Sequence, residues 1–322
     1  MLLEVRDLRM YYEIEGKGWV KAVDGVSFTL DKEESLGIVG ESGCGKSSLA
    51  TTLIKVLPTN AKIFGGEILL DGVDILKMPE NRLRREIRWQ KIAMVFQGSM
   101  NALNPIIKVG DQIVEAILTH KRMSKRRAWK RAEKLLKMVG LDSSIVHRYP
   151  FELSGGQKQR SVIAMALALR PKILIADEPT TALDVIVQAQ ILKLLKNLQR
   201  EFGLSLIFIS HDISAVSEVS DKVAVMYAGK IVELGSVEDI FLRPQHPYTK
   251  ALLRAVPSIR EEKRELKSIP GTPPNLLSPP PGCRFHPRCP YAFGRCREEE
   301  PKLFEAEPGH LVACHLLGGE TA

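Results

Sequence analysis

The chain has 322 residues, of which 44% are hydrophobic and 26% charged, an ordinary balance for a globular protein with a buried core. No apolar run approaches the roughly 18 residues of a membrane-spanning helix, and residues 1–6 lack the apolar core of a signal peptide. We therefore expect neither an integral membrane protein nor a secreted one, but a cytosolic protein or one that sits on a membrane through partners. The formal net charge of +8 is modest and unevenly spread.

Apolar strands alternate with helical segments over about the first 250 residues, which predicts an α/β core with a largely parallel sheet. The opening segments instead alternate in polarity or carry turn signals, and they predict antiparallel strands beside that sheet at residues 3–8, 21–30 and 66–70. From about residue 98 to 169 the pattern becomes mainly helical, and we interpret this stretch as an inserted helical subdomain. Its expected helices are residues 111–120, 125–139 and 157–169.

A glycine-rich loop (residues 40–48) stands between an apolar strand and a helical segment, the context in which G-x-x-x-x-G-K-[ST] binds phosphate. Glycines let successive N–H groups converge on one anion, and the helix N-terminus adds partial positive charge. Lys46 would reach the β- and γ-phosphates, and the Ser47 hydroxyl would ligate Mg²⁺. The loop therefore predicts a bound nucleoside triphosphate. The expected contacts are Gly40, Ser42, Gly43, Cys44, Gly45, Lys46, Ser47 and Ser48.

Nine cations crowd residues 121–137 within the expected helical region. Leu135 and Leu136 would give this segment an apolar side, with Ser124 as its helix cap. Three interpretations stay open. We favour a solvated basic helix face, then attraction to anionic lipid headgroups, and we place nucleic-acid binding last because we see no aromatic platform between the charges.

The apolar strand at 172–176 ends in Asp177 and Glu178, where α/β proteins place ligand chemistry. Asp177 would hold Mg²⁺ through its water shell, and Glu178 would orient and polarise the attacking water. Upstream, a second anion-binding surface opens an apolar helix with Ser154, Gly155, Gly156 and Gln157. Since one phosphate site is already present, we expect the second to serve a nucleotide held by a neighbouring chain.

In this order the motifs resemble the ATP-hydrolysing subunit of an ATP-binding cassette (ABC) transporter. The glycine-rich loop is similar to that family's Walker A motif, residues 173–178 to its Walker B strand and catalytic acid, and residues 153–157 to its signature. Four further positions resemble family motifs. Tyr12 resembles the aromatic residue stacked on adenine, although Tyr11 beside it is an alternative, and Gln97 resembles the loop glutamine that touches Mg²⁺ and the membrane subunits. Asp184 resembles the D-loop aspartate, and His211 resembles the switch histidine at the γ-phosphate.

The resemblance implies a P-loop NTPase with a RecA-like core, an antiparallel β subdomain and the inserted helical subdomain, hydrolysing ATP with Glu178, His211 and Lys46 as catalytic residues. It implies Mg²⁺ bound by Ser47, Gln97 and Asp177. It also implies a two-chain sandwich, in which the glycine-rich loop of one subunit holds ATP and Ser154 and Gly156 of the other cap it.

The same resemblance implies the partners of the chain. They are a second ABC ATPase subunit, identical or related, two transmembrane permease subunits and, indirectly, an extracytoplasmic substrate-binding protein, with no nucleic acid. The protein would lie peripherally on the cytoplasmic side of the inner or plasma membrane.

After residue 259 the composition shifts to prolines and cysteines, so we expect a cassette at 1–258 and a Cys-rich module at 259–322. Residues 246–253 and 282–290 resemble the C-terminal region of oligopeptide and dipeptide importer ATPases. The implied substrate is a short peptide, although nickel and oligosaccharide importers share this architecture. A soluble cassette ATPase acting on nucleic acid or ribosomes is a further alternative, but such proteins usually carry two cassettes or a long coiled coil, and this chain shows no sustained heptad run.

Four cysteines of the module point to metal, because a reducing cytosol disfavours disulfides: Cys283, Cys289, Cys296 and Cys314. Zinc sites favour Cys pairs separated by about two to four residues, and the spacing here is wider. The similar module of peptide-importer ATPases implies a [4Fe–4S] cluster with a structural role, which we favour over Zn²⁺. Four unliganded thiols stay an open alternative.

Overall fold

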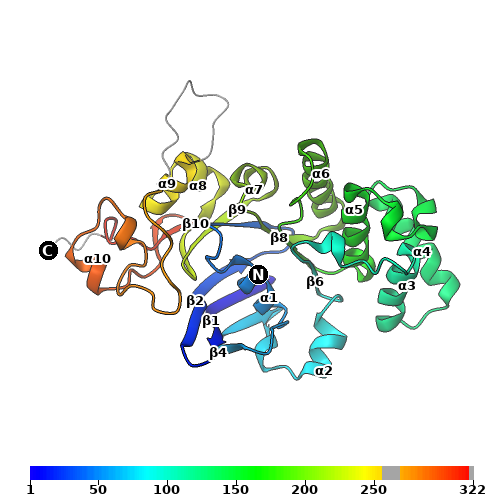
Figure 1. Cartoon of the computed structure of the whole chain (residues 1–322), viewed down its shortest axis with the longest axis horizontal. Helices are drawn as coiled ribbons and strands as arrows, with labels where there is room; N and C mark the ends of the chain where they lie inside the picture. Colours follow the sequence, from blue (N-terminus) through cyan, green and yellow to red (C-terminus); the bar gives the residue numbers. More distant parts are fainter. Residues whose placement is uncertain (256–268, 319–322) are drawn as a thin grey trace. The chain divides into compact units, whose positions relative to one another are not determined.

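The structure is a computed structural model that describes residues 1–255 and 269–318 (Figure 1). The expected boundary between the cassette and the Cys-rich module, at 258/259, lies outside these residues. The chain divides into two compact units. The first unit is formed by residues 1–30, 36–76 and the chain from 209 on, and the second by residues 31–35 and 77–208.

The first unit contains two sets of strands with short helices between them. Its elements are β1 (Leu3–Ile14), β2 (Gly18–Leu30), β3 (Ser35–Val39), α1 (Lys46–Leu53), β4 (Ala61–Leu70), β5 (Val73–Asp74), α7 (Ile213–Val219), β9 (Lys222–Tyr227), β10 (Lys230–Ser236), α8 (Val237–Leu242), α9 (Pro247–Arg254), α10 (Gly294–Glu298), β11 (Phe304–Glu307) and β12 (His310–Val312).

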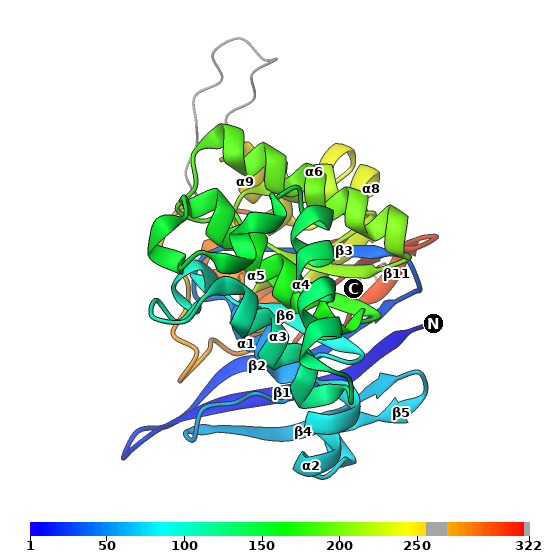
Figure 2. The same cartoon turned by 90° about the vertical axis from the view of Figure 1, so that its right-hand side faces the viewer.

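The opening strands form an antiparallel sheet in the order β2-β1-β4-β5, and Figure 2 shows β1, β2 and β4 side by side. Alternate apolar side chains of β1 are fully buried, which sets its register against β2 and β4. A bulge interrupts β1 at Asp7, which has φ +43°, and Gly66 of β4 lies so close that an added Cβ would meet the Leu8 Cα at 2.5 Å. The predicted antiparallel strands are therefore confirmed, and all three run further than expected.

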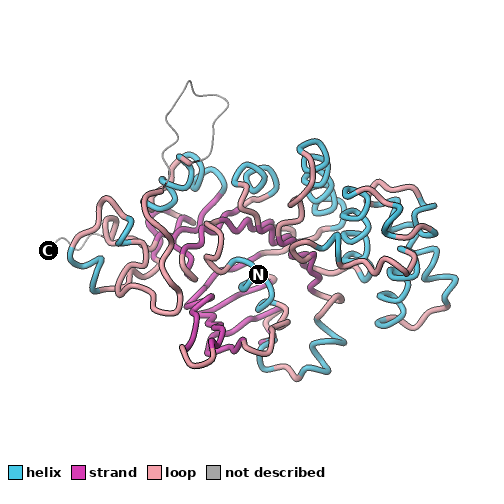
Figure 3. Tube along the Cα trace, in the orientation of Figure 1, coloured by secondary structure: helices cyan, strands magenta, loops and turns pink. Residues whose placement is uncertain are grey.

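The remaining strands of the first unit follow the order β11-β12-β10-β9-β3, in which β3 pairs with β9 in parallel and the other pairs are antiparallel. All five residues of β3 are buried, as in a strand covered on both faces. The chain leaves β3 directly into the glycine-rich loop. Most of residues 269–318 are loop, as Figure 3 shows, so side-chain contacts hold this segment in place more than secondary structure does.

The second unit carries buried strands and most of the long helices of the described chain (Figure 3). Its elements are α2 (Glu80–Arg82), β6 (Ile92–Val95), α3 (Val109–His120), α4 (Lys125–Met138), α5 (Gly155–Ala166), β7 (Ile173–Asp177), α6 (Val185–Phe202) and β8 (Ser205–Ile209). The last residue of β8, Ile209, belongs to the first unit. β6 and β7 pair in parallel, with Ile92 opposite Ile173. The expected helices are confirmed by α3, α4 and α5, although α5 already begins at Gly155 and turns into a 3-10 helix after Ala166.

Two details of the basic segment differ from the sequence expectation. Ser124 stands at the N-cap of α4, the position predicted for it, but its side chain makes no capping hydrogen bond. One aromatic residue, Trp129, does lie between the cations, and it stacks on His147 with ring centroids 5.5 Å apart. This ring is therefore engaged within the protein, while the apolar side of α4 is buried through Ala128, Ala132, Leu135 and Leu136.

No helix within residues 1–255 and 269–318 combines the length and the apolar character that crossing a bilayer requires.

Candidate functional site

The glycine-rich loop connects β3 to α1 through glycines that hold left-handed backbone conformations, with φ +154° at Gly40 and +108° at Gly45. An added Cβ at Gly45 would lie 2.0 Å from the Ala22 carbonyl oxygen, and one at Gly40 would lie 2.2 Å from that of Met226. Only glycine fits such positions, because any side chain there would both strain the backbone and overlap a carbonyl. The loop is thus folded tightly against neighbouring strands before α1 begins.

Lys46 is the first residue of α1, and its side chain turns back beneath the loop. It is 6% exposed, and its Nζ donates to the carbonyls of Gly40 at 2.7 Å and Glu41 at 3.0 Å. The ammonium group therefore lies within the curve of the loop, where a bound anion would compete with the two carbonyls for it. Burial raises the pKa of the neighbouring Cys44 thiol against the opposing effect of Lys46, as expected for a small buried filler.

Two tyrosines of β1 have different surroundings. The Tyr12 hydroxyl donates to the Ser48 Oγ at 3.0 Å, so this ring lies at the start of α1. Tyr11 instead donates to the Asp24 carboxylate at 2.6 Å and stacks on Phe64, and burial with this hydrogen bond raises its pKa to about 12. Tyr11 is thus engaged by Asp24 and Phe64, whereas Tyr12 lies beside the glycine-rich loop.

His211 follows β8 and is exposed. The turn around it is fixed by its neighbours, since Ser210 Oγ accepts from the Asp212 N–H and the Asp212 carboxylate caps α7 through the N–H groups of Ser214 and Ala215. This cap holds the histidine on the surface of the first unit.

The second unit presents the two predicted acids at the end of β7. Asp177 is its last residue and is 2% exposed. Glu178 follows with φ +47°, a strained conformation for a residue other than glycine, and such strain concentrates at functional sites. Its carboxylate accepts from Gln97 Nε2 at 3.0 Å and from Thr181 Oγ1 at 3.1 Å. The structure therefore brings Gln97 and Glu178 together, and it adds Thr181, which the sequence did not single out.

Residues 154–157 form a complete capping box at the start of α5. The Ser154 hydroxyl accepts from the Gln157 N–H at 3.3 Å, and the Gln157 side chain accepts from the Ser154 N–H at 3.0 Å. Asp184 caps α6 in the same way through the Val187 N–H, at 2.9 Å. A Cβ on Gly156 would meet Val187 Cγ1 at 2.7 Å, so the bare backbone of Gly156 allows α5 and α6 to begin close together.

Cys283, Cys289, Cys296 and Cys314 carry free thiols, and Cys44 is also a free thiol. Burial raises the pKa of Cys283 to about 11, and the charges of Cys314, Cys296 and Cys289 add to this effect. Within the described residues no three of these sulfurs lie within 4.8 Å of one another. Tetrahedral zinc with Zn–S bonds of about 2.3 Å would place four such sulfurs about 3.8 Å apart, closer than any three of them lie in the described residues.

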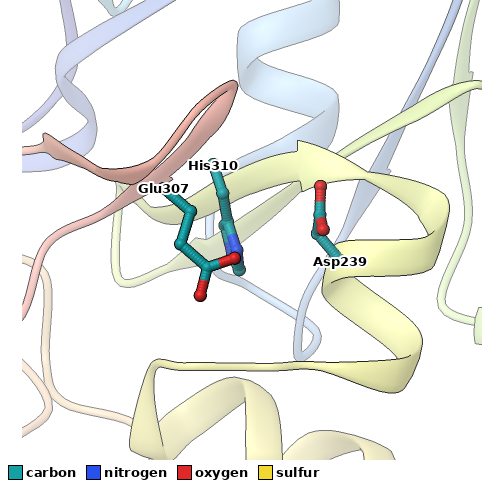
Figure 4. A group of neighbouring side chains, drawn as sticks. All are labelled: Asp239, Glu307 and His310. Carbon is teal, nitrogen blue, oxygen red and sulfur yellow. The ribbon is translucent and has the colours of Figure 1, made fainter.

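Over residues 1–255 and 269–318, one group of three side chains meets the distances of a metal site: Asp239, Glu307 and His310, drawn in Figure 4. Arg243 pairs with both carboxylates, and His310 Nε2 lies 2.8 Å from the fully buried Glu233 carboxylate. Protein cations and donors therefore already balance these acids. This network joins α8, β10 and the β11–β12 hairpin, and no local sequence pattern indicates it because its members lie far apart in the chain.

Two family models match the chain. The ABC transporter model matches residues 23–181, and the model of the oligopeptide/dipeptide transporter C-terminal region matches residues 232–296. The first match includes the glycine-rich loop and the acids at the end of β7. The second runs from β10 to Cys296.

Curated proteins are similar over nearly the whole chain. The oligopeptide transport ATP-binding protein OppD of Bacillus subtilis is 49% identical over 320 residues, which are 98% of this chain and 89% of that protein. The dipeptide transport ATP-binding protein DppD of the same organism is 48% identical over 318 residues, 98% of this chain and 94% of that protein. Among solved structures, a dimeric post-hydrolysis state of the ATP-binding cassette MJ0796 bound to ADP and Pi is similar with a TM-score of 0.66 and 29% identity, covering 73% of this chain and 99% of that one.

Proposed function

Because the chain belongs to the ABC transporter family and carries the oligopeptide/dipeptide transporter C-terminal region, we propose that it is the ATP-hydrolysing subunit of a peptide importer. Its fold is that of an ATP-binding cassette, a P-loop NTPase with mixed sheets. The observation that carries the proposal is the glycine-rich loop, where left-handed glycines and the inward-turned Lys46 precede α1. Such a loop suits a triphosphate, since its amides and ammonium group form charge-assisted hydrogen bonds to the phosphates.

We assign the following roles to predicted site residues. Lys46 would leave the carbonyls of its own loop for the β- and γ-phosphates, and Tyr12 would stack on the adenine. Ser47, Gln97 and Asp177 are assigned to Mg²⁺, which neutralises developing charge on the phosphates when bound. His211 is assigned to the γ-phosphate.

Glu178 is assigned to the attacking water. Gln97 and Thr181 already hold its carboxylate by hydrogen bonds, so its orientation is set before a nucleotide arrives. Its strained backbone supports the same role, because strain is retained where surrounding contacts enforce a functional conformation.

We propose that two such chains, or this chain and a related one, close on ATP face to face. The capped start of α5, with Ser154 and Gly156, would meet the nucleotide of the partner chain. The dimeric state of the similar MJ0796 cassette supports this arrangement. Asp184 would act beside it at the capped start of α6.

Short peptides are the substrate we favour over nickel and oligosaccharides, because the similar proteins are named for oligopeptide and dipeptide transport. Substrate would be selected by a binding protein and two permease subunits, with this chain bound to the permeases on the cytoplasmic side. The direct test is reconstitution with those subunits in liposomes. ATP-dependent uptake of a labelled dipeptide or oligopeptide, lost in Glu178→Gln, supports the proposal. Uptake of nickel or oligosaccharide alone would replace the substrate assignment, and co-purification with ribosomes or DNA in place of permeases would favour the soluble alternative.

For the Cys-rich module we propose a [4Fe–4S] cluster held by Cys283, Cys289, Cys296 and Cys314. Burial is the main cause that raises the pKa of Cys283, Cys289 and Cys314, and the charges of neighbouring cysteines add to it, so these side chains lie near enough to support a shared ligand. A cluster would cross-link a loop-rich segment. Iron and acid-labile sulfide in anaerobically purified protein would support it, and stoichiometric zinc without sulfide would overturn it.

A further inference from the structure

Two arginines next to cysteines of the Cys-rich module reach away from the cysteines and into the supports of the glycine-rich loop. Arg284 follows Cys283, and Arg288 precedes Cys289. Both arginine side chains are at most 6% exposed, which is unusual for arginine and shows that each is committed to specific partners.

Arg288 holds the loop itself. Its guanidinium donates to both carboxylate oxygens of Glu41, at 2.7 and 3.0 Å, and Glu41 is the second residue of the glycine-rich loop. The hydrogen bond to Glu41 raises the pKa of Arg288 against the effect of burial, so the guanidinium is charged at neutral pH. Further guanidinium hydrogen bonds go to the Pro270 and Ile269 carbonyls and to the Tyr227 hydroxyl.

The backbone of Glu41 is held from a second side. Its N–H donates to the Tyr248 hydroxyl at 2.9 Å, and Tyr248 packs against Tyr227 and Phe285 with ring centroids 4.6 and 5.4 Å apart. Phe285 lies between the two arginines in sequence, so this aromatic cluster fixes the same short segment to the loop.

Arg284 holds the loop indirectly. It pairs with the Asp24 carboxylate and donates to the Ala228 carbonyl, while the next residue, Gly229, donates its N–H to the Cys44 carbonyl at 2.8 Å. Burial acts to raise the pKa of Asp24, but Tyr11, Lys230 and Arg284 outweigh it and lower the pKa. The β9–β10 turn is thereby fixed against the far end of the glycine-rich loop.

The geometry points to a clamp on the glycine-rich loop, formed by Arg288 directly and by Arg284 indirectly. This clamp positions the loop for nucleotide, so that the Cys-rich module sets the affinity for ATP. Two effects follow from the Arg288–Glu41 pair. It neutralises a carboxylate beside the place where the phosphates would bind, and it fixes the backbone whose amides would contact them. Arg288 is a positioning residue, since it acts on nucleotide through Glu41. This inference rests on the proposed ATP site.

The test compares Mg-ATP affinity in the full-length protein and five variants: Arg288→Gln, Glu41→Gln, the double variant, Arg295→Gln as a matched control in the same segment, and Lys46→Ala as a reference. Arg295 forms an ion pair with Glu299 at the end of α10, and that pair does not involve the loop. We expect Arg288→Gln to weaken Mg-ATP binding about tenfold, with kcat at saturating ATP retained. The control should bind as wild type does.

The double variant separates a specific pair from general damage. Two glutamines remove both charges while keeping hydrogen-bonding groups, so we expect the double variant to bind ATP better than Arg288→Gln alone. It also keeps the inference testable if Arg288→Gln alone does not fold. Additive losses, or wild-type affinity in folded Arg288→Gln, would overturn the clamp. Lys46→Ala serves as a reference for the ATP site. If Lys46→Ala binds ATP normally, the proposed ATP site is wrong. If Lys46→Ala loses ATP binding while Arg288→Gln binds as wild type does, only the clamp is rejected.

Discussion

Replacing His246 with asparagine should remove a large part of the acid sensitivity of the fold. His246 is 1% exposed and stands at the N-cap of α9, where its Nδ1 accepts from the Tyr248 N–H at 3.0 Å. Because Nδ1 accepts this hydrogen bond, the neutral ring carries its proton on Nε2, and a hydrogen bond to the Ala313 backbone acts to raise the pKa of His246. Protonation of Nδ1 would break the cap, and burial accordingly lowers the pKa of His246 to about 3.

The magnitude follows from this depressed pKa. In the unfolded chain the imidazole binds a proton near pH 6.5, whereas in the folded protein it does not, so the unfolded state gains protons first as the pH falls. The contribution to stability is complete above pH 6.5 and is lost as the pH falls toward 3. At about 1.36 kcal/mol per pH unit, the 1.5 units between 6.5 and 5.0 correspond to about 2 kcal/mol.

Urea unfolding at pH 7.5 and at pH 5.0 measures this loss as a fall in unfolding free energy. Asparagine keeps an acceptor for the cap but does not titrate, so His246→Asn should lower stability at pH 7.5 and lose about 2 kcal/mol less on acidification than wild type. His147→Asn, at an exposed histidine, is the control and should keep the wild-type loss. An unchanged pH dependence in His246→Asn would refute the reasoning.

Three further substitutions test the site. Glu178→Gln should keep Mg-ATP binding and lose at least about 100-fold in turnover, and near-normal hydrolysis would remove Glu178 from its role. Gly45→Ala should weaken Mg-ATP binding at least about 30-fold, because the added Cβ would overlap the Ala22 carbonyl at a left-handed backbone position. Gly65→Ala is the control and should bind as wild type does, because a Cβ there meets open space. Equal affinities in the two variants would contradict the packing argument. Cys283→Ser should lower bound iron and sulfide together, and unchanged iron would exclude this cysteine as a ligand. Burial raises the pKa of Cys283 to about 11, so the fraction of thiolate, and with it metal uptake by the apoprotein, should rise with pH between 7 and 9.

Residues of the ATP site could be proposed from sequence because each motif is contiguous and combines a residue type with a backbone context. Glycines beside Lys46 after an apolar strand, and paired acids after another, carry their chemistry within a few positions. The same locality explains the confirmed helices, whose apolar residues recur at helical spacing.

Features that depend on distant pairs could not be seen in the sequence. Glu41 and Arg288 are 247 positions apart, and no local pattern links them. The full length of β1 was also missed, because the bulge at Asp7 breaks the alternation that marks a strand. Ser124 shows the converse limit: it has the right residue type at the right position, yet its side chain does not make the cap.

Whether nucleotide joins two cassettes is decided most directly by the molar mass of the Glu178→Gln variant in solution, measured by light scattering with its natural mate present. With saturating Mg-ATP we expect the mass of a dimer, and with Mg-ADP that of separate chains, because only the triphosphate would contact both subunits. Separate chains in saturating Mg-ATP would contradict a shared site and weaken the assignment to transport.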